Sequence, residues 1–327
     1  MQFHLGFIPA VSAQKITHND GLLLIGSCFS EHIGNHLNDF KFDVNTNPLG
    51  IVFNPKSIET ALNRIIHKTF FTKEDVFEKE DLWYTFEAHS SISATTAEEL
   101  IIILNESMGH WHEKLKHAHW LMITFGTAFA YQELSKNAIV ANCHKLPQAH
   151  FNKVLLQSED IVETYTTLLE QLRQFNSHLH VLFTVSPVKH LRDGVVENNL
   201  SKAILIQSVH ALIKNQPHCV YFPAYELVND DLRDYRFYES DMAHPNKQAI
   251  EYVWKRFAEV YFNPTTLSIN EKVLHIHQAY RHRLLKETTE SSSKFKHKFY
   301  QKCVILQSEF PHLNLSKELQ YFNTYQD

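Results

Sequence analysis

The feature that most constrains the fold is a series of short, unbroken apolar runs separated by segments with helical periodicity. The runs occupy residues 22–25, 120–125, 180–185 and 219–222. Continuous apolar runs are typical of strands that are covered on both faces of a parallel sheet. Because parallel strands need long crossover connections, the pattern predicts an α/β protein with a mostly parallel sheet and helices on both faces.

Amphipathic periodicity predicts the helices between these runs. Apolar residues recur at helical spacing over residues 29–40, 55–67, 197–214 and 250–261. Thr96 and Glu99 form a capping-box pattern at the start of a further helix that runs towards His112, and Ser158 is a candidate cap for a helix that ends near Phe175.

The sequence changes character after Asn263 and Pro264. The remainder is predicted to be helical, with a capping box at Ser268 and Glu271 and a break at Ser291–Ser293. We therefore expect an α/β domain over residues 1–262 and a helical C-terminal extension over residues 263–327. The extension is rich in Lys and Arg, which is explained either by a solvated outer face or by a docking surface for a protein partner.

Charge and cysteine usage exclude several classes of protein. The chain has 327 residues, 31 Lys+Arg and 36 Asp+Glu, so no basic excess points to nucleic acid. No apolar run reaches the length of a membrane span, and no membrane partner is expected. The four cysteines lie far apart, which argues against a disulfide framework and fits a reducing compartment, so we expect a cytoplasmic protein.

The most specific local pattern is Asp241-Met242-Ala243-His244-Pro245. Pro245 suits the start of a helix, which puts Asp241 and His244 in the preceding turn. A carboxylate in such a turn can hold an imidazole in one tautomer while the other ring nitrogen faces a nucleophile. A helix-capping Asp beside a surface His would produce the same letters.

The second pattern is Gly26-Ser27-Cys28, where the first predicted strand meets the first predicted helix. The carboxyl end of a strand in an open α/β sheet is where ligands bind, and the helix amides there favour an anion. Ser27 and Cys28 are therefore candidate nucleophiles. Alternatively, Gly26 permits the turn, Ser27 caps the helix and Cys28 fills the core.

Together the two patterns resemble the SGNH/GDSL hydrolase superfamily, and the local sequences resemble its GSCFA family. The resemblance covers residues 20–262 and is carried by IGSCFSEHIG, GTAFAY, VANCHK, SPVKHLRDG and the segment that ends in ESDMAHP. It implies a three-layer flavodoxin-like fold of the SGNH type. It also implies hydrolysis or transfer of ester-linked acyl groups through a covalent acyl-enzyme, with no cofactor.

The resemblance assigns roles residue by residue. Gly26 matches the motif glycine, His244 the general base and Asp241 its orienting partner. Gly50 matches the glycine of the second block, whose amide donates to the oxyanion, and Gly126 marks the third block. The oxyanion would be held by the backbone amides of the nucleophile and of Gly50, and by a further side-chain donor.

Two departures from the superfamily pattern matter. In ungapped register Cys28 stands at the position of the catalytic serine, and a shift of one residue would restore Ser27. A thiol at a helix N-terminus beside an imidazole is expected to have a lowered pKa. Ala128 stands where the superfamily has an asparagine, which removes one oxyanion donor. Asn142 and His144 are candidate replacements, unless their segment is only a turn that closes a strand pair.

The sequence thus predicts an esterase, acyl hydrolase or acyltransferase that acts on an acylated carbohydrate or a similar polar ester. A different class remains open, namely a non-catalytic protein that retains the fold and binds a small molecule or carbohydrate. Clustered histidines at positions 110, 112, 117 and 119 could hold zinc, but no ligand set is complete and no metal is expected.

Overall fold

The chain is described by a computed structural model over residues 5–282 and 290–323, and it divides into two compact units. The first, here called the sheet unit, comprises residues 5–9, 21–34 and 44–256. The second, the helical unit, comprises residues 10–20, 35–43 and 257–323 without the undescribed stretch 283–289. Every candidate site residue lies in the sheet unit.

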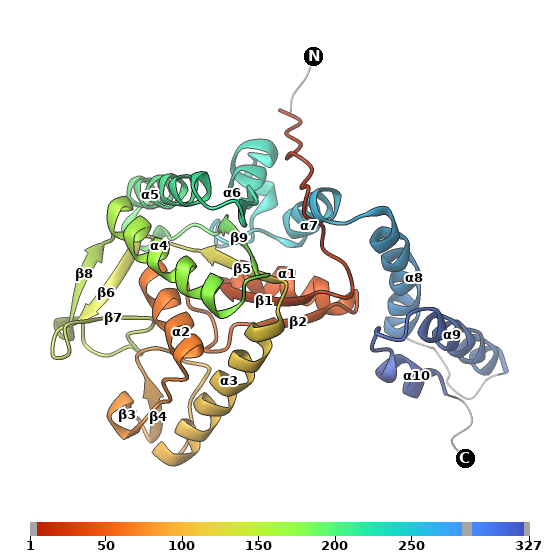
Figure 1. Cartoon of the computed structure of the whole chain (residues 1–327), viewed down its shortest axis with the longest axis horizontal. Coiled ribbons are helices and arrows are strands. Elements are labelled where there is room, and N and C mark those ends of the chain that lie inside the picture. Colours follow the sequence, from red (N-terminus) through yellow and green to blue (C-terminus); the bar gives the residue numbers. More distant parts are fainter. Residues whose placement is uncertain (1–4, 283–289, 324–327) are drawn as a thin grey trace. The chain divides into compact units, whose positions relative to one another are not determined.

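A five-stranded sheet forms the centre of the sheet unit (Figure 1). Its strands are β1 (Gly21–Gly26), β2 (Asp43–Thr46), β5 (Trp120–Phe125), β9 (His180–Val185) and β10 (Cys219–Tyr221), in the order β10-β9-β5-β1-β2. The pairs β1–β5, β5–β9 and β9–β10 are parallel. Taken in chain order this is the flavodoxin-like arrangement 2-1-3-4-5, which confirms the predicted fold class.

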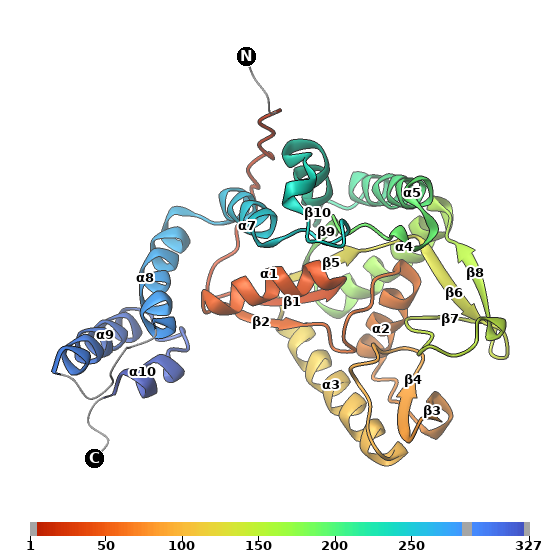
Figure 2. The same cartoon turned by 180° about the vertical axis from the view of Figure 1, so that it is seen from behind.

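Helices cover both faces of the sheet (Figures 1 and 2). One face packs against α2 (Pro55–His67), α3 (Ala97–His117), α4 (Ser158–Phe175) and α5 (Val195–Lys214). Alternate residues of the strands, such as Leu23, Ile123 and Phe183, enter the core on this side and are almost fully buried. The opposite face is covered by α1 (Cys28–Asp39) and α7 (Lys247–Tyr261).

Two small antiparallel sheets were not predicted from the sequence. They are the hairpin of β3 (Val76–Lys79) and β4 (Leu82–Thr85), and a three-stranded sheet of order β7-β6-β8. The latter consists of β6 (Phe129–Glu133), β7 (Ala138–Val140) and β8 (Phe151–Leu155). These strands are short and only partly buried, so they lack the continuous apolar run that marked the central strands.

Short helical turns complete the sheet unit. They are α6 (Ala224–Glu226), the π-helical turn Leu227–Leu232 that continues it, and 3₁₀ turns at Lys73–Asp75, Gln148–His150, Leu191–Asp193 and Tyr235–Phe237.

The predicted helix limits are correct to within a residue or two in most cases. Thr96 caps α3 by accepting the N–H of Glu99 at 3.2 Å, but the Glu99 carboxylate accepts the N–H of Thr95 rather than that of Thr96. The reciprocal half of the predicted capping box is therefore displaced by one residue. Ser158 is the first helical residue of α4, and Gln157 occupies the capping position.

The helical unit contains α8 (Pro264–Arg281), α9 (Glu290–Glu309) and α10 (Ser316–Phe322), which share a core that includes Val273, Cys303 and Phe322. Asn263 caps α8 by accepting the N–H of Thr266 at 2.8 Å. The predicted capping box at Ser268 is wrong, since that residue lies inside the helix. The tail is divided into the separate helices α8 and α9 as predicted, but the division does not fall at Ser291–Ser293, because these serines belong to the first turn of α9.

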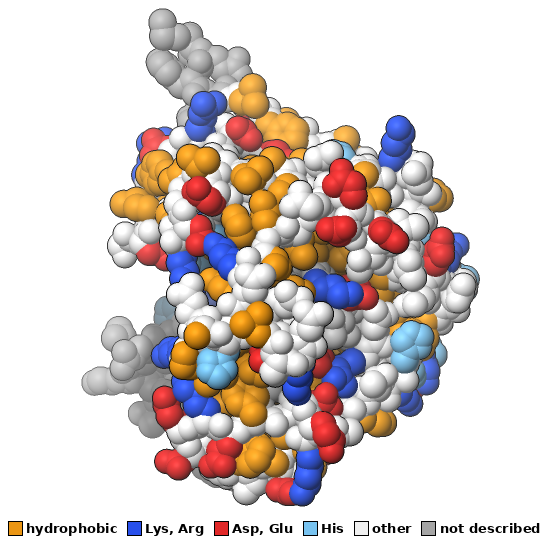
Figure 3. Space-filling view, turned by 90° about the vertical axis from the view of Figure 1, so that its left-hand side faces the viewer, with side chains coloured by type: hydrophobic (Ala, Val, Ile, Leu, Met, Phe, Trp, Pro, Cys, Tyr) orange, Lys and Arg blue, Asp and Glu red, His pale blue; other side chains and the backbone are white. Residues whose placement is uncertain are grey.

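The surface of one face carries acidic and basic side chains intermingled with hydrophobic ones (Figure 3). This distribution agrees with the small net charge of -5. Of the helices in the described part of the chain, none is long and apolar enough to cross a membrane.

Candidate active site

Asp241 and His244 form a closed turn immediately before α7. His244 Nδ1 lies 2.6 Å from Asp241 Oδ2, and Asp241 Oδ1 accepts the N–H groups of His244 and Ala243 at 3.0 and 2.9 Å. Met242 has a left-handed φ of 56°, which lets the carboxylate fold back on the turn. The N–H bonds of His244 and Ala243 lower the pKa of Asp241 to about 2, and the bond from the imidazole adds to this effect. No described residue hydrogen bonds to Nε2 of His244, which leaves that nitrogen available to a ligand.

This turn is docked on the loop that follows β9. The N–H of Lys189 donates to the carbonyl oxygen of Ala243 at 3.0 Å. The Lys189 ammonium lies 4.0 Å from the ring centroids of Tyr235 and Tyr238, which hold it by cation–π contacts. The His244 turn is therefore fixed to the carboxyl end of the sheet.

Gly26 makes the tight turn from β1 into α1. Its φ is 142°, and a Cβ at this position would collide with the carbonyl oxygen of Thr124 on β5. Ser27, which follows, donates its N–H to the same oxygen at 3.3 Å. Only glycine allows this approach of the two strand ends, so the turn holds Ser27 and Cys28 beside β5.

Ser27 and Cys28 occupy different environments. Ser27 is 3% exposed, and its Oγ accepts the N–H of Phe29 at 3.2 Å, as a helix cap does. Cys28 is the first residue of α1 and is half-buried. Of the two candidate nucleophiles, Cys28 is the more accessible.

The expectation of a lowered pKa at Cys28 is wrong. Burial raises the pKa of the thiol, and the nearby carboxylate of Glu31 raises it further. The amides of Phe29 and Cys28 and the ammonium of Lys202 act in the opposite direction but are weaker. Desolvation disfavours the thiolate more than the helix N-terminus favours it, so the thiol needs a base to react.

Lys202 is a functional candidate that the sequence reasoning missed. It projects from α5, is 1% exposed, and donates hydrogen bonds to the carbonyl oxygens of Gly126 at 2.5 Å and Ser186 at 2.7 Å. Burial lowers its pKa to about 7. A signal was present in the sequence, because Lys202 lies at helical spacing from Leu205 and Val209 on the buried face of α5.

Gly126, which follows β5, lies against His190, a second functional candidate that was not recognised from the sequence. A Cβ at Gly126 would come within 2.8 Å of Phe53 Cβ and 3.2 Å of His190 Nε2. The N–H of Gly126 donates to the carbonyl oxygen of Phe53 at 2.7 Å. Ala128 is fully buried and donates its N–H to Ser201 Oγ at 2.7 Å, so this position is part of the core.

The other predicted oxyanion residues are engaged in local structure. The N–H of Gly50 donates to the carbonyl oxygen of Asn47 at 3.0 Å, in a turn where Gly50 has a φ of 70°. Asn142 Oδ1 accepts the N–H of His144 at 2.8 Å. His144 is 4% exposed; its Nε2 lies 2.7 Å from the carbonyl oxygen of Thr85, and burial lowers its pKa.

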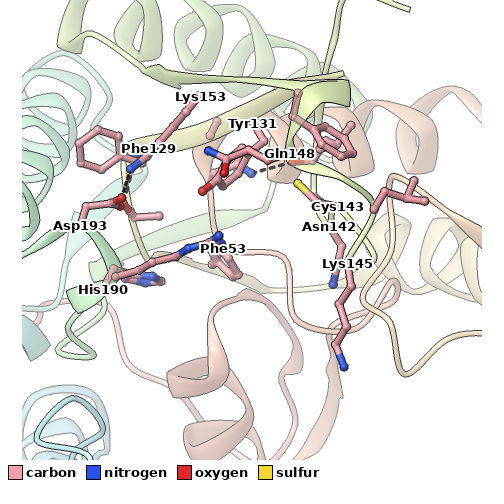
Figure 4. A pocket seen from close by; sticks show the side chains of 18 of the residues that line it. Phe53, Phe129, Tyr131, Asn142, Cys143, Lys145, Gln148, Lys153, His190 and Asp193 are labelled. Atoms are coloured by element: carbon pink, nitrogen blue, oxygen red, sulfur yellow. Dashed lines mark hydrogen bonds and ion pairs between the residues drawn. The ribbon is translucent and has the colours of Figure 1, made fainter. Parts of the chain in front are cut away.

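A cavity of about 660 Å³ opens beside Phe53 and His190 (Figure 4). It lies between the β7-β6-β8 sheet and the loop after β9, and a ligand of monosaccharide or disaccharide size would fit it. Lys153 on one wall forms an ion pair with Asp193 on the other. The lining includes the aromatic residues Phe53, Phe129, Tyr131 and Phe151, the polar residues Asn142 and Gln148, and the imidazole of His190.

Electrostatic interactions connect the candidate residues. The charge of Lys202 acts on both Cys28 and His190, and that of His244 acts on His190. Lys202 lies at the carboxyl ends of β5 and β9, where it hydrogen bonds to the carbonyl oxygens of Gly126 and Ser186, and its charge acts on Cys28 at the start of α1 and on His190 after β9. No hydrogen bond among the described residues joins Cys28 directly to His244. His144 is separate from these residues, since its ring packs against Tyr84 at a centroid distance of 4.8 Å.

The clustered histidines near the end of α3 make structural contacts. His112 Nδ1 lies 2.7 Å from the carbonyl oxygen of Ile65, and His110 Nε2 lies 2.9 Å from Asn45 Oδ1. His119 Nδ1 accepts the N–H of Gly21 at 3.1 Å. Within residues 5–282 and 290–323, no three His, Cys, Asp or Glu side chains are grouped as a metal site.

The fold and the site together define a flavodoxin-like α/β protein with a His–Asp pair at the carboxyl edge of its sheet. The family model described as GSCFA family matches residues 21–257, and the chain belongs to this family. The predicted family is thereby confirmed.

A search of curated proteins found no match. Among solved structures, a carbohydrate esterase family 3 from Talaromyces cellulolyticus aligns with a TM-score of 0.36 and 8% identity, over 77% of this chain and 98% of that chain. An acetyl xylan esterase, Est2A, from the rumen bacterium Butyrivibrio proteoclasticus aligns with a TM-score of 0.37 and 10% identity, over 77% of this chain and 64% of that chain.

Proposed function

We propose that this protein is an SGNH-type acyl esterase that transfers an acyl group from a carbohydrate or similar polar ester to its own nucleophile and then to water. The observation that carries the proposal is the Asp241–His244 pair. Its hydrogen bond of 2.6 Å fixes the imidazole, and Nε2 is left without a partner among the described residues, at the edge of the sheet where ligands bind.

The nucleophile in this proposal is Cys28. Its thiol is more accessible than the Ser27 hydroxyl, and its raised pKa makes a general base necessary. His244 Nε2 takes the thiol proton as sulfur bonds to the ester carbonyl carbon. The resulting oxyanion collapses, the C–O bond to the alcohol breaks, and the leaving alkoxide takes the proton from His244.

The second half of the reaction regenerates the thiol. A water molecule gives its proton to His244 as it attacks the thioester carbonyl, and the tetrahedral adduct expels sulfur, which recovers that proton. The products are the carboxylic acid and the free enzyme. If a sugar hydroxyl replaces water in this step, the same residues perform acyl transfer.

The cavity supports a carbohydrate as the alcohol part of the ester. Its volume of about 660 Å³ suits a sugar, and aromatic rings such as Tyr131 offer apolar faces next to hydrogen-bonding groups such as Gln148. Its lining includes Thr127, just after β5, and His190, but neither Cys28 nor His244, so a sugar bound there would lie near the carboxyl end of β5 with its ester group extending towards these two residues.

Mass spectrometry of the intact protein after brief incubation with 4-nitrophenyl acetate tests the proposal. An added acetyl mass that maps to the peptide containing Cys28, and that is absent from His244→Ala, is the expected result. If neither an adduct nor turnover appears with this ester or with acetylated methyl glycosides, the esterase proposal is wrong and a binding protein becomes the better explanation. Labelling that does not depend on His244 would show only that a thiol is exposed.

A further inference from the structure

The oxyanion donors suggested by the sequence are largely committed elsewhere. The N–H groups of Gly50 and Gly126 both donate to backbone carbonyl oxygens, at 3.0 and 2.7 Å. Ala128 has no side-chain donor and lies in the core. Asn142 lines the cavity, but Phe53 lies between it and His190 (Figure 4). An ester carbonyl held near Cys28 would therefore lack a side-chain donor from the third block.

His190 is held beside Gly126, the glycine that marks the third block. Its backbone N–H donates to Asn198 Oδ1 at 2.9 Å, and its ring packs on Phe53 with the centroids 5.1 Å apart. Nε2 lies over Gly126, 3.2 Å from where a Cβ would stand. The absence of a side chain at Gly126 is what admits the imidazole to the end of β5.

The Nε2 atom of His190 is buried and has no hydrogen-bond partner within the described chain. A buried polar atom without a partner destabilises a fold, so the unpaired Nε2 of His190 is explained most simply by a polar group that a ligand supplies. The same ring lines the 660 Å³ cavity.

The imidazole of His190 remains neutral under ordinary conditions. Burial lowers its pKa to about 3, and the nearby charges of Lys202 and His244 contribute, against a smaller opposite effect of Asp193. A neutral imidazole carries one N–H, and in the Nε2–H tautomer that donor would lie over Gly126. Neutral imidazole can stabilise a developing oxyanion without being consumed as an acid.

We propose that His190 is a catalytic residue that donates a hydrogen bond from Nε2 to the oxyanion, replacing the asparagine that Ala128 displaces. The inference rests on the proposed esterase function. The second donor is the backbone N–H of Cys28 at the start of α1. No proton is transferred to or from His190 at any step.

Paired substitutions of His190 test this assignment with 4-nitrophenyl acetate as the substrate. His190→Phe keeps a ring on Phe53 but removes the donor, whereas the side-chain amide of His190→Gln can present an N–H near the position of Nε2. We expect kcat to fall about 100-fold or more in His190→Phe, with KM changed by less than about threefold. His190→Gln should stay within about tenfold of the wild type. His210→Phe, on the outer side of α5, is the matched control and should behave as the wild type.

A second readout separates a donor from a structural role. A trifluoromethyl ketone forms an adduct that carries the oxyanion, so its inhibition constant should rise in His190→Phe by about the factor lost in kcat. The inhibition constant of acetate, which forms no such adduct, should not change. Thermal unfolding of each variant reports on folding.

The possible failures are distinguishable. If wild-type protein shows no turnover, the esterase function is wrong and this inference falls with it. If the wild type is active and His190→Phe has the same kcat, only the role of His190 is wrong. An equal loss in His190→Gln and His190→Phe, with unchanged affinity for the ketone, would also overturn the donor role.

Discussion

His244 Nδ1 lies 2.6 Å from Asp241 Oδ2 in a turn that is anchored by two backbone N–H bonds to the other carboxylate oxygen. This arrangement orients the imidazole before any substrate arrives. Asp241→Asn should therefore reduce kcat by about 10³–10⁴-fold, because the amide no longer selects the tautomer with a free Nε2. Steady-state kinetics with 4-nitrophenyl acetate measure the loss.

The pH dependence offers a check on the same pair. The folded pKa of Asp241 is about 2, below the ordinary value, so its stabilising interaction is fully present above the ordinary carboxyl pKa and is lost only as pH falls through about 2. No limb of the pH–rate profile between pH 4 and 9 should then belong to Asp241. A direct titration of the Asp241 carboxyl by NMR that gives a pKa of 4 or above would contradict the structure.

Replacement of Ser27 and replacement of Cys28 should have opposite effects on the acyl adduct and on stability. Cys28→Ala should abolish the acyl adduct and leave stability nearly unchanged. Ser27→Ala should retain the adduct but lose about 1 kcal/mol of unfolding free energy, because Ser27 Oγ caps α1. Peptide mapping and urea denaturation separate the two effects. An adduct that survives Cys28→Ala and disappears in Ser27→Ala would make Ser27 the nucleophile.

Lys202 should make the free energy of unfolding rise with pH in the neutral to alkaline range. Its folded pKa of about 7 lies below the ordinary value of 10.5, so the unfolded chain binds more protons between these pH values and stability rises with pH. The contribution of this one group is at most about 1.4 kcal/mol per pH unit. Cys28, Cys219 and several tyrosines have raised pKa values, so these groups lower the stability of the folded chain at high pH. The effect of Lys202 is therefore measured as the difference in unfolding free energy between the wild type and Lys202→Met.

The expected result is that the stability difference between wild type and Lys202→Met grows in favour of the wild type from pH 7 to pH 10. Urea denaturation at several pH values gives this difference directly. A constant difference would mean that Lys202 keeps an ordinary pKa despite its burial.

Gly26 and Gly109 form a matched pair for a stability test. A Cβ at Gly26 would strike the Thr124 carbonyl, at a φ of 142° that other residues rarely adopt. Gly26→Ala should therefore unfold the protein or lower its stability by about 3 kcal/mol or more. Gly109 lies inside α3, where a Cβ would meet no atom of the described chain within 4 Å beyond its own helix backbone, so Gly109→Ala should add about 1 kcal/mol. Equal stabilities of the two variants would refute the proposed close approach of β1 and β5.

The helical periodicity and the unbroken apolar runs were sufficient to predict the central sheet and its main helices. Burial of both faces of a parallel strand leaves a direct trace in the sequence, as in Trp120–Phe125. The strands β6, β7 and β8 left no such trace, because each has one partly exposed face and is held mainly by pairing with its neighbour. The cavity wall that they build was invisible for that reason.

The sequence by itself determined the α/β order, the family and the turn that joins Asp241 to His244, since all of these depend on residues that are close in the chain. Only the tertiary structure decided the electrostatic environment of Cys28, Lys202 and His190. The pKa of Cys28 is raised because burial outweighs the helix amides. Lys202 and His190 reach Gly126 from separate segments of the chain. Desolvation and contacts between distant segments depend on the packed surroundings of a group, and local sequence carries little information about them.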